Sequence, residues 1–202
     1  HNVKSGVRIL SDREIEGYGR FRGGWGGENP YAVYFAARFN RPFDRCGTWK
    51  GESVSSDSLR EGIDVGAWGE FVLSQQGCVE LQVAISYISE AQAWRNLESV
   101  GARDFDSVRE SADSVWNRAL SVIRVEGGSP EQKTVFYTGL YHALTMPTDL
   151  GQDENPQWQD GERHFWDFYT LWDTYRTVMP LYTLVFPERQ REIIRCLLDI
   201  YD

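Results

Sequence analysis

The sequence predicts an α+β multidomain protein: part of a β-sandwich, then a helical connector, then the first helices of an α-domain. Thirteen of the nineteen glycines precede residue 90, and in that half apolar residues recur at every second position. After residue 89 they recur at every third or fourth position. The first spacing is typical of strands and the second of helices, so the chain changes from one to the other near residue 89.

Two segments of the first half alternate most clearly. Every second residue is apolar in 31–39 (Tyr31, Val33, Phe35, Ala37, Phe39) and in 79–87 (Val79, Leu81, Val83, Ile85, Tyr87). We predict that the second segment is a half-buried strand with its apolar side in the core. Residues 70–74 and a turn at 75–77 precede it, which predicts a β-hairpin.

Weaker strand candidates lie at residues 7–10 and 15–21, and the glycine-rich segment 19–27 is predicted to be a turn or a bulge. Antiparallel strands joined by such turns favour part of a β-sandwich over residues 1–88.

Residues 89–128 are predicted to be the connector. Ser89 and Gln92 fit a capping box, in which each side chain pairs with a backbone N–H at the helix start, so a helix is expected over about 90–100. Asp104 or Asp106 can cap a second helix. Its apolar residues form one stripe: Val108, Ala112, Val115, Trp116, Ala119, Leu120 and Ile123.

Residues 129–202 are predicted to open the α-domain. Ser129, Pro130 and Gln132 mark the start of a helix over about 130–145, which Pro147 ends. After a polar loop, a helix is expected over about 169–186, interrupted at Pro180, and a last one over 187–201. Because the sequence stops on an apolar helix, we expect it to be part of a longer protein.

Composition excludes several classes of function. A net charge of −9 argues against a nucleic-acid partner, which requires an excess of lysine and arginine. No run of 18 apolar residues exists, so no membrane span is predicted. The three cysteines match no zinc spacing and are interpreted as buried small hydrophobic residues.

The stretch FWDFYTLWDTYR (165–176) contains the strongest site candidate. Asp173 precedes Arg176 by three residues, so both are expected on one side of a helix, beside Trp172. One interpretation is a buried ion pair that holds the helix against a neighbour. The other is a sugar pocket, in which the aromatic faces stack on a pyranose and Asp173 and Arg176 bind its hydroxyls. The pattern alone leaves both open.

Other titratable residues point to no chemistry of their own. The carboxylates of the loop before Trp172 and His164 are interpreted as solvated, and His142 as a core histidine. The loop does not have the spacing of a calcium-binding loop.

Five blocks of the sequence resemble glycoside hydrolase family 92, the calcium-dependent exo-acting α-mannosidases. They occur in that family's order: YAVYFAARFNRPF (31–43), VAISYISEAQAWRNLE (83–98), VWNRALSVIRVEG (115–127), FYTGLYHALTMP (136–147) and LWDTYRTVMPLYTLVFPE (171–188). The resemblance implies part of the N-terminal β-sandwich over 1–88, a helical connector over 89–128, and the first helices of an (α/α)6 catalytic barrel over 129–202.

The resemblance also implies a function. Such enzymes hydrolyse terminal α-linked mannose from glycans with inversion, and they are secreted or periplasmic. Their catalytic acid and base and most ligands of the Ca²⁺ cofactor come from later in the barrel. This chain would therefore supply no catalytic residue and no assigned metal ligand. Asp173 would bind the terminal mannose, while Trp172 and Arg176 would shape the pocket.

Mannose-containing glycans and the remainder of the barrel are the expected partners. The alternatives are a non-catalytic carbohydrate-binding module of β-sandwich and helices, a structural or partner-binding helical protein, and a barrel completed by another chain. We expect the isolated 202-residue chain to have no measurable mannosidase activity.

Overall fold

The computed structural model describes residues 1–202 except 25–26, 28, 75–76, 150–152, 154–170 and 202. The chain divides into two compact units, His1–Phe105 and Asp106–Asp202. The division lies inside the predicted connector, and the predicted domain boundaries stay predictions. No described helix is both long and apolar enough to cross a membrane.

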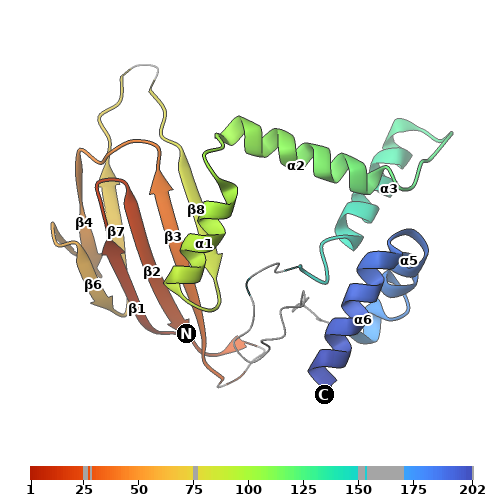
Figure 1. Ribbon diagram of the computed structural model, residues 1–202, viewed down its shortest axis with the longest axis horizontal. Helices are drawn as coiled ribbons and strands as arrows, with labels where there is room; N and C mark the ends of the chain where they lie inside the picture. The colour runs from red at the N-terminus through yellow and green to blue at the C-terminus, as the bar shows by residue number, and fades with distance from the viewer. Residues whose placement is uncertain (25–26, 28, 75–76, 150–152, 154–170, 202) are drawn as a thin grey trace. The chain divides into compact units, whose positions relative to one another are not determined.

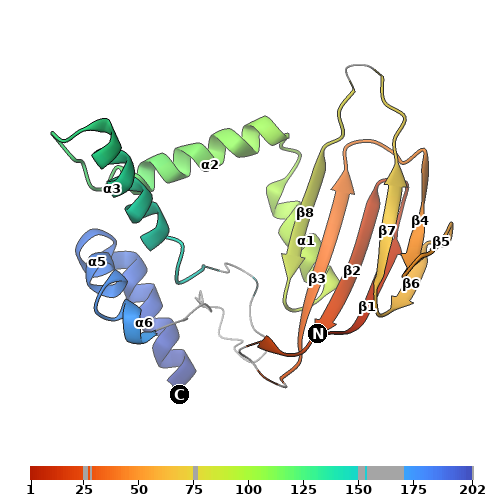
Figure 2. The ribbon, with the colours of Figure 1, turned by 180° about the vertical axis from the view of Figure 1, so that it is seen from behind.

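The first unit contains two antiparallel sheets that face each other (Figures 1 and 2). The larger sheet has the spatial order β6 (Leu59–Gly62), β1 (Asn2–Ile9), β2 (Glu14–Phe21), β3 (Tyr31–Phe39), β8 (Leu81–Ser86). The smaller has the order β5 (Ser53–Ser55), β4 (Arg45–Lys50), β7 (Val65–Glu70). This arrangement confirms a sandwich-like β unit, and β3 has the bounds that the alternation predicts.

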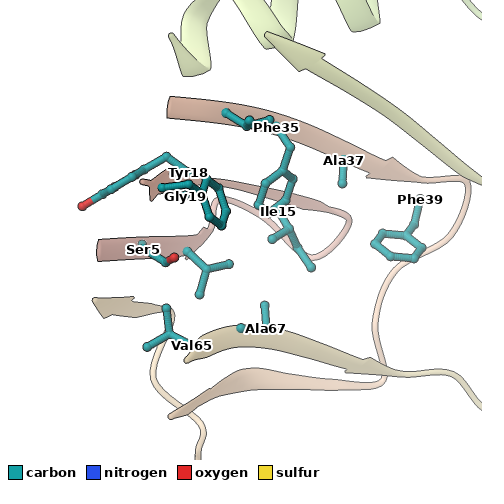
Figure 3. A pocket seen from close by; sticks show the side chains of 14 residues that line it. Ser5, Ile15, Tyr18, Gly19, Phe35, Ala37, Phe39, Val65 and Ala67 are labelled. Atoms are coloured by element: carbon teal, nitrogen blue, oxygen red, sulfur yellow. The ribbon is translucent and has the colours of Figure 1, made fainter. Parts of the chain in front are cut away.

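Apolar side chains from both sheets form the core between them (Figure 3). Phe35, Ala37 and Phe39 of β3 face Val65 and Ala67 of β7 across an apolar cavity of about 380 Å³. At the end of β3, the ring centroids of Phe39, Phe43 and Phe71 are 5.1–5.5 Å apart.

The prediction for 79–87 is right about the strand and wrong about its buried side. Leu81, Val83 and Ile85 of β8 are 50%, 53% and 51% exposed, whereas Ser86 is fully buried. They pair with Phe39, Ala37 and Phe35 and so share their face of the sheet. The smaller sheet is built on β4, β5 and β7 and leaves β8 uncovered, while a helix covers the other face (Figures 1 and 2).

The predicted hairpin across 70–87 is also wrong, because β7 and β8 belong to different sheets. Residues on either side of the predicted turn form hydrogen bonds with Asp44 and Asn40 and do not pair with each other. The N–H of Val72 donates to Asp44 (2.6 Å), and the N–H of Asn40 donates to the carbonyl of Glu80 (3.0 Å). The segment therefore crosses between the sheets. Cys78, which lies in it, is exposed rather than buried, whereas Cys196 is buried as expected.

Helix α1 (Glu90–Val100) packs on the outer face of the larger sheet, against β3 and β8. Ala36 of β3 and Ala93 and Leu97 of α1 form a fully buried cluster. Ser89 caps the helix by accepting the N–H of Gln92 (3.1 Å). The second half of the predicted capping box is absent: the side-chain oxygen of Gln92 accepts from the Nε–H of Arg95 (2.8 Å), and the backbone N–H of Ser89 donates to the hydroxyl of Ser86 (3.5 Å).

A buried carboxylate also joins α1 to the sheet. Glu16 of β2 is 6% exposed; it accepts the indole N–H of Trp94 (2.8 Å) and the Nε–H of Arg8 (2.9 Å). Arg38 lies over the Trp94 ring at 5.3 Å and pairs with Glu98 of the same helix (2.6 Å). Charged residues of the sheet thus hold α1 in place, and each of these charges has a hydrogen-bond or ion-pair partner.

Glu16→Ala should lower the free energy of unfolding of this unit by about 2 kcal/mol, because it leaves the Trp94 N–H and Arg8 without their acceptor. Urea unfolding followed by circular dichroism measures the loss. Glu61→Ala is the matched control: Glu61 pairs with Lys4 at 3.2 Å, but both side chains are about half exposed, so a much smaller loss than for Glu16→Ala is expected. Equal losses in the two variants would contradict the role of Glu16.

The second unit is helical. Its elements are α2 (Phe105–Leu120), α3 (Pro130–Ala143), α4 (Leu171–Thr174), α5 (Val178–Val185) and α6 (Pro187–Tyr201). Leu140, Leu144, Tyr182 and Ile193 form its buried core. Trp116, Ala119 and Leu120 at the end of α2, and Ile123 just after it, pack on them. The predicted stripe of α2 therefore divides: its later residues pack, whereas Val108 and Val115 are exposed.

The break before the last helices lies elsewhere than predicted. Residues 175–177 form a turn, and Pro180 is the third residue of α5 rather than an interruption. Proline is tolerated there because the N–H groups of the first helical turn have no partner within the helix.

Candidate functional site

Side-chain hydrogen bonds hold both ends of α3, the helix that precedes the WDTYR segment in the sequence. Ser129 and Gln132 form a complete capping box at the start of α3, as the sequence predicts. At its other end, the fully buried Tyr182 of α5 donates its hydroxyl hydrogen to the carbonyl of Ala143 (2.8 Å). Tyr182 thus fixes α5 against the end of α3.

Arg189 of α6 extends this anchor. Its Nη2 donates to the carbonyl of Pro147 (3.0 Å), and its guanidinium lies 5.5 Å from the ring of Tyr182. Burial raises the pKa of the Tyr182 phenol, and the charge of Arg189 opposes that rise only in part. The end of α3 and the turn after it are therefore tied to the middle of α5 and the start of α6.

Helix α4 carries two of the three predicted site residues at the surface of this unit. Trp172 is 67% exposed, and Asp173 is exposed beside it. The hydroxyl of Thr177 donates to the carbonyl of Asp173 (2.9 Å), which holds the turn after the helix. An exposed indole beside an exposed carboxylate can stack on a sugar ring and accept hydrogen bonds from its hydroxyls.

The prediction that Asp173 and Arg176 lie on one side of a helix is wrong, because α4 ends at Thr174. Arg176 lies in the following turn, with its guanidinium 4.9 Å from the ring of Tyr175. Within the part of the chain that the structure describes, no ion pair joins Asp173 to Arg176. The buried ion pair is therefore contradicted, since both residues are exposed. Their contact with a sugar stays a prediction.

The remaining titratable candidates are dispersed. His142 is exposed rather than in the core, with its ring 5.8 Å from Tyr141. Asp153 is buried, although the loop carboxylates were expected to be solvated. His164 lies outside the described residues, as do Glu154, Asp160, Glu162 and Asp167.

The described residues do not form a calcium site. Among them, no group of three or more aspartate, glutamate, histidine or cysteine residues is placed to hold a metal ion. Calcium therefore stays a prediction, and no chemical step is assigned to it.

Comparisons with known proteins cover both units. Residues 1–86 match the glycosyl hydrolase family 92 N-terminal domain, and residues 92–202 match the family 92 catalytic domain.

The chain belongs to glycosyl hydrolase family 92.

Solved structures of family 92 enzymes have the same fold. A family 92 α-mannosidase from Bacteroides thetaiotaomicron is similar over 98% of this chain, with a TM-score of 0.87 and 26% identity. It has also been solved in complex with mannoimidazole. An inverting mannosidase of family 92 from the same organism is similar over 100% of this chain, with a TM-score of 0.85 and 26% identity. The predicted fold class, with part of a sandwich and the first helices of an (α/α)6 barrel, is confirmed.

A curated relative from Arthroderma benhamiae is named an uncharacterized secreted glycosidase; it is 35% identical in an alignment of 121 residues that covers 56% of this chain. The chain spans only part of these family 92 proteins: 16% of the curated relative and 28% and 29% of the two mannosidases.

Proposed function

We propose that this chain is part of a secreted or periplasmic inverting exo-α-mannosidase that removes terminal α-linked mannose from glycans. The observation that carries the proposal is the similarity, over the whole of this chain, to the inverting family 92 mannosidase. The exported location is supported by the relative that is named a secreted glycosidase.

Within that enzyme, we assign to this chain the binding of the terminal sugar. Trp172 provides an exposed aromatic face, and the carboxylate of Asp173 accepts hydrogen bonds from mannose hydroxyls. Arg176 supports the wall of the pocket from the adjoining turn. Hydrolysis with inversion requires a carboxylic acid and a carboxylate about 6.5–9.5 Å apart with water between them. We assign both to barrel helices beyond this chain.

The rest of the barrel is the proposed partner of α6. Ile193 and Leu197 of this helix pack in the core of the helical unit. Ile194, Leu198 and Tyr201, spaced four and three residues apart, are 47%, 57% and 86% exposed on another face. Barrel helices that follow in the longer protein would cover this apolar stripe.

Hydrolysis of an aryl α-mannoside by the full-length protein, followed by ¹H NMR, tests the proposed function. Inversion predicts that β-mannose appears first and then mutarotates. The 202-residue chain alone is expected to release no mannose, since it lacks the acid and the base. Absence of mannose release by the full-length protein, or α-mannose as the first product, contradicts the proposal.

A further inference from the structure

Two tryptophans lie on the face of the smaller sheet that points away from the core. Val65 and Ala67 of β7 point toward the larger sheet (Figure 3), and Trp68 follows Ala67, so its side chain points outward. Trp68 pairs with Gly47 of β4, and Trp49 pairs with Gly66. Paired residues and residues two apart share a face, so both indoles occupy the outer side of β4 and β7.

The indole of Trp49 lies across a glycine of the neighbouring strand, and Trp68 contacts its paired glycine at the ring edge. A Cβ on Gly66 would meet three consecutive ring atoms of Trp49 at 2.4–2.6 Å, which places the face of that ring over the glycine. A Cβ on Gly47 would meet the carbonyl oxygen of Ser55 first and one ring atom of Trp68 at 2.9 Å. Because the Trp49 ring covers Gly66 with one face, its other face can stack on a ligand, while Trp68 lines the adjoining cleft.

The same face carries a neutral pair of charges. Arg45 pairs with Glu70 at 3.2 Å, and both side chains are more than half exposed. The guanidinium of Arg45 also lies 5.9 Å from the ring of Trp68. A cleft of about 380 Å³ lies beside them, and this volume is within the range of small-molecule sites. It is lined by Arg45, Cys46, Val54, Ser55, Ser56 and Trp68.

We propose that this outer face, the tryptophan platform (Arg45, Trp49, Trp68 and Glu70), binds a neutral pyranose residue of a polysaccharide. The apolar C–H face of a pyranose stacks on an indole, while Arg45 donates to its hydroxyls and Glu70 accepts from them. Because the two charges cancel, the platform favours a neutral sugar over an anion. The inference rests on the proposed function in one respect, the expectation that the substrate is a glycan. Binding of a sugar to the platform does not depend on hydrolysis.

Native electrophoresis of the full-length protein in gels that contain soluble yeast α-mannan tests the platform. We expect the mannan to retard the wild-type protein. Trp49→Ala and Trp68→Ala should each weaken the apparent affinity by about five- to tenfold, because each removes one stacking face. Both variants should hydrolyse a small aryl α-mannoside within about twofold of the wild type, which also reports correct folding.

Two controls separate the platform from other causes. Trp172→Ala removes an exposed tryptophan of the proposed mannose pocket, so it should lower hydrolysis and retain most of the retardation. Val54→Glu, at the exposed edge of the cleft, places a charge beside Trp49, its partner across the strands, and should weaken retardation with both tryptophans retained. It decides the result where a tryptophan variant does not fold.

Unchanged retardation of both platform variants, or a wild-type protein that mannan does not retard, overturns the platform. So does a dimer that dissociates on Trp49→Ala, because a second copy would then occupy this face. If the wild-type protein is retarded but hydrolyses no mannoside, the proposed function fails and the platform stands.

Discussion

Replacing Asp173 by alanine should lower kcat/KM for an aryl α-mannoside by about 10- to 150-fold in the full-length protein. This range corresponds to the loss of a hydrogen bond between a charged group and the substrate, which is worth about 1.5–3 kcal/mol. Since Asp173 is exposed on a four-residue helix, the substitution should change the free energy of unfolding by less than about 0.5 kcal/mol. Steady-state kinetics and urea unfolding measure the two effects separately.

Glu188→Ala provides the matched control for Asp173. Glu188 is another exposed carboxylate of the helical unit, paired with Arg191 at 2.5 Å on the first turn of α6. Its loss should leave kcat/KM within about twofold of the wild type. If Asp173→Ala retains full activity, or if its loss of activity follows a loss of stability, Asp173 does not contact the sugar.

Tyr182→Ala should have the largest effect on stability, a loss of about 3–5 kcal/mol for the helical unit. The ring is fully buried against Phe186, and its hydroxyl donates to the carbonyl at the end of α3. Tyr182→Phe retains the ring and removes only the hydrogen bond, so it should cost about 1–2 kcal/mol. Urea unfolding of the variants gives both values, and equal stability of Tyr182→Phe and wild type would exclude a role for the hydrogen bond.

The Tyr182 phenol also predicts a dependence on alkaline pH. Burial raises its pKa, so the folded state holds the proton more tightly than the unfolded state does. The stability that results is fully present below about pH 10, the pKa of an unfolded tyrosine, and is lost as the pH rises through the folded pKa. Tyr182→Phe should remove this part of the alkaline loss. An identical alkaline profile in the two proteins would contradict the prediction.

Local signals predicted the helix starts well. Ser89 and Ser129 both accept the backbone N–H three residues later, because a cap depends only on residues within one turn. The sequence predicts the break at Pro180, whereas it lies at residues 175–177. Proline is common in the first turn of a helix as well as at interruptions, so its position alone does not distinguish the two.

Pairing between distant strands was the part that the sequence could not predict. The alternation of Leu81, Val83 and Ile85 identifies a strand, but which face is buried depends on α1 and on the extent of the second sheet. The hairpin failed for a similar reason, because Asp44 and Asn40 bind the segment from far along the chain.

The two candidate sugar sites differ in how visible they are in the sequence. Trp172 and Asp173 belong to the aromatic-rich stretch 165–176, which can be identified from the sequence alone. Trp49 and Trp68 are two residues from a glycine in each case, as Gly47-x-Trp49 and Gly66-x-Trp68, and become a platform only when the register of β4 and β7 is known. The buried Glu16 was missed because its partner Trp94 lies 78 residues away.

The crystal structure of the full-length protein with a non-hydrolysable α-mannoside tests the central claim most directly. The account predicts that a carboxylate oxygen of Asp173 lies within hydrogen-bond distance, about 2.5–3.2 Å, of a hydroxyl of the terminal mannose. It also predicts that Trp172 and Arg176 line the same pocket. A mannoside that is bound in the active site with none of these three residues near it would contradict the assignment of this chain to the sugar pocket.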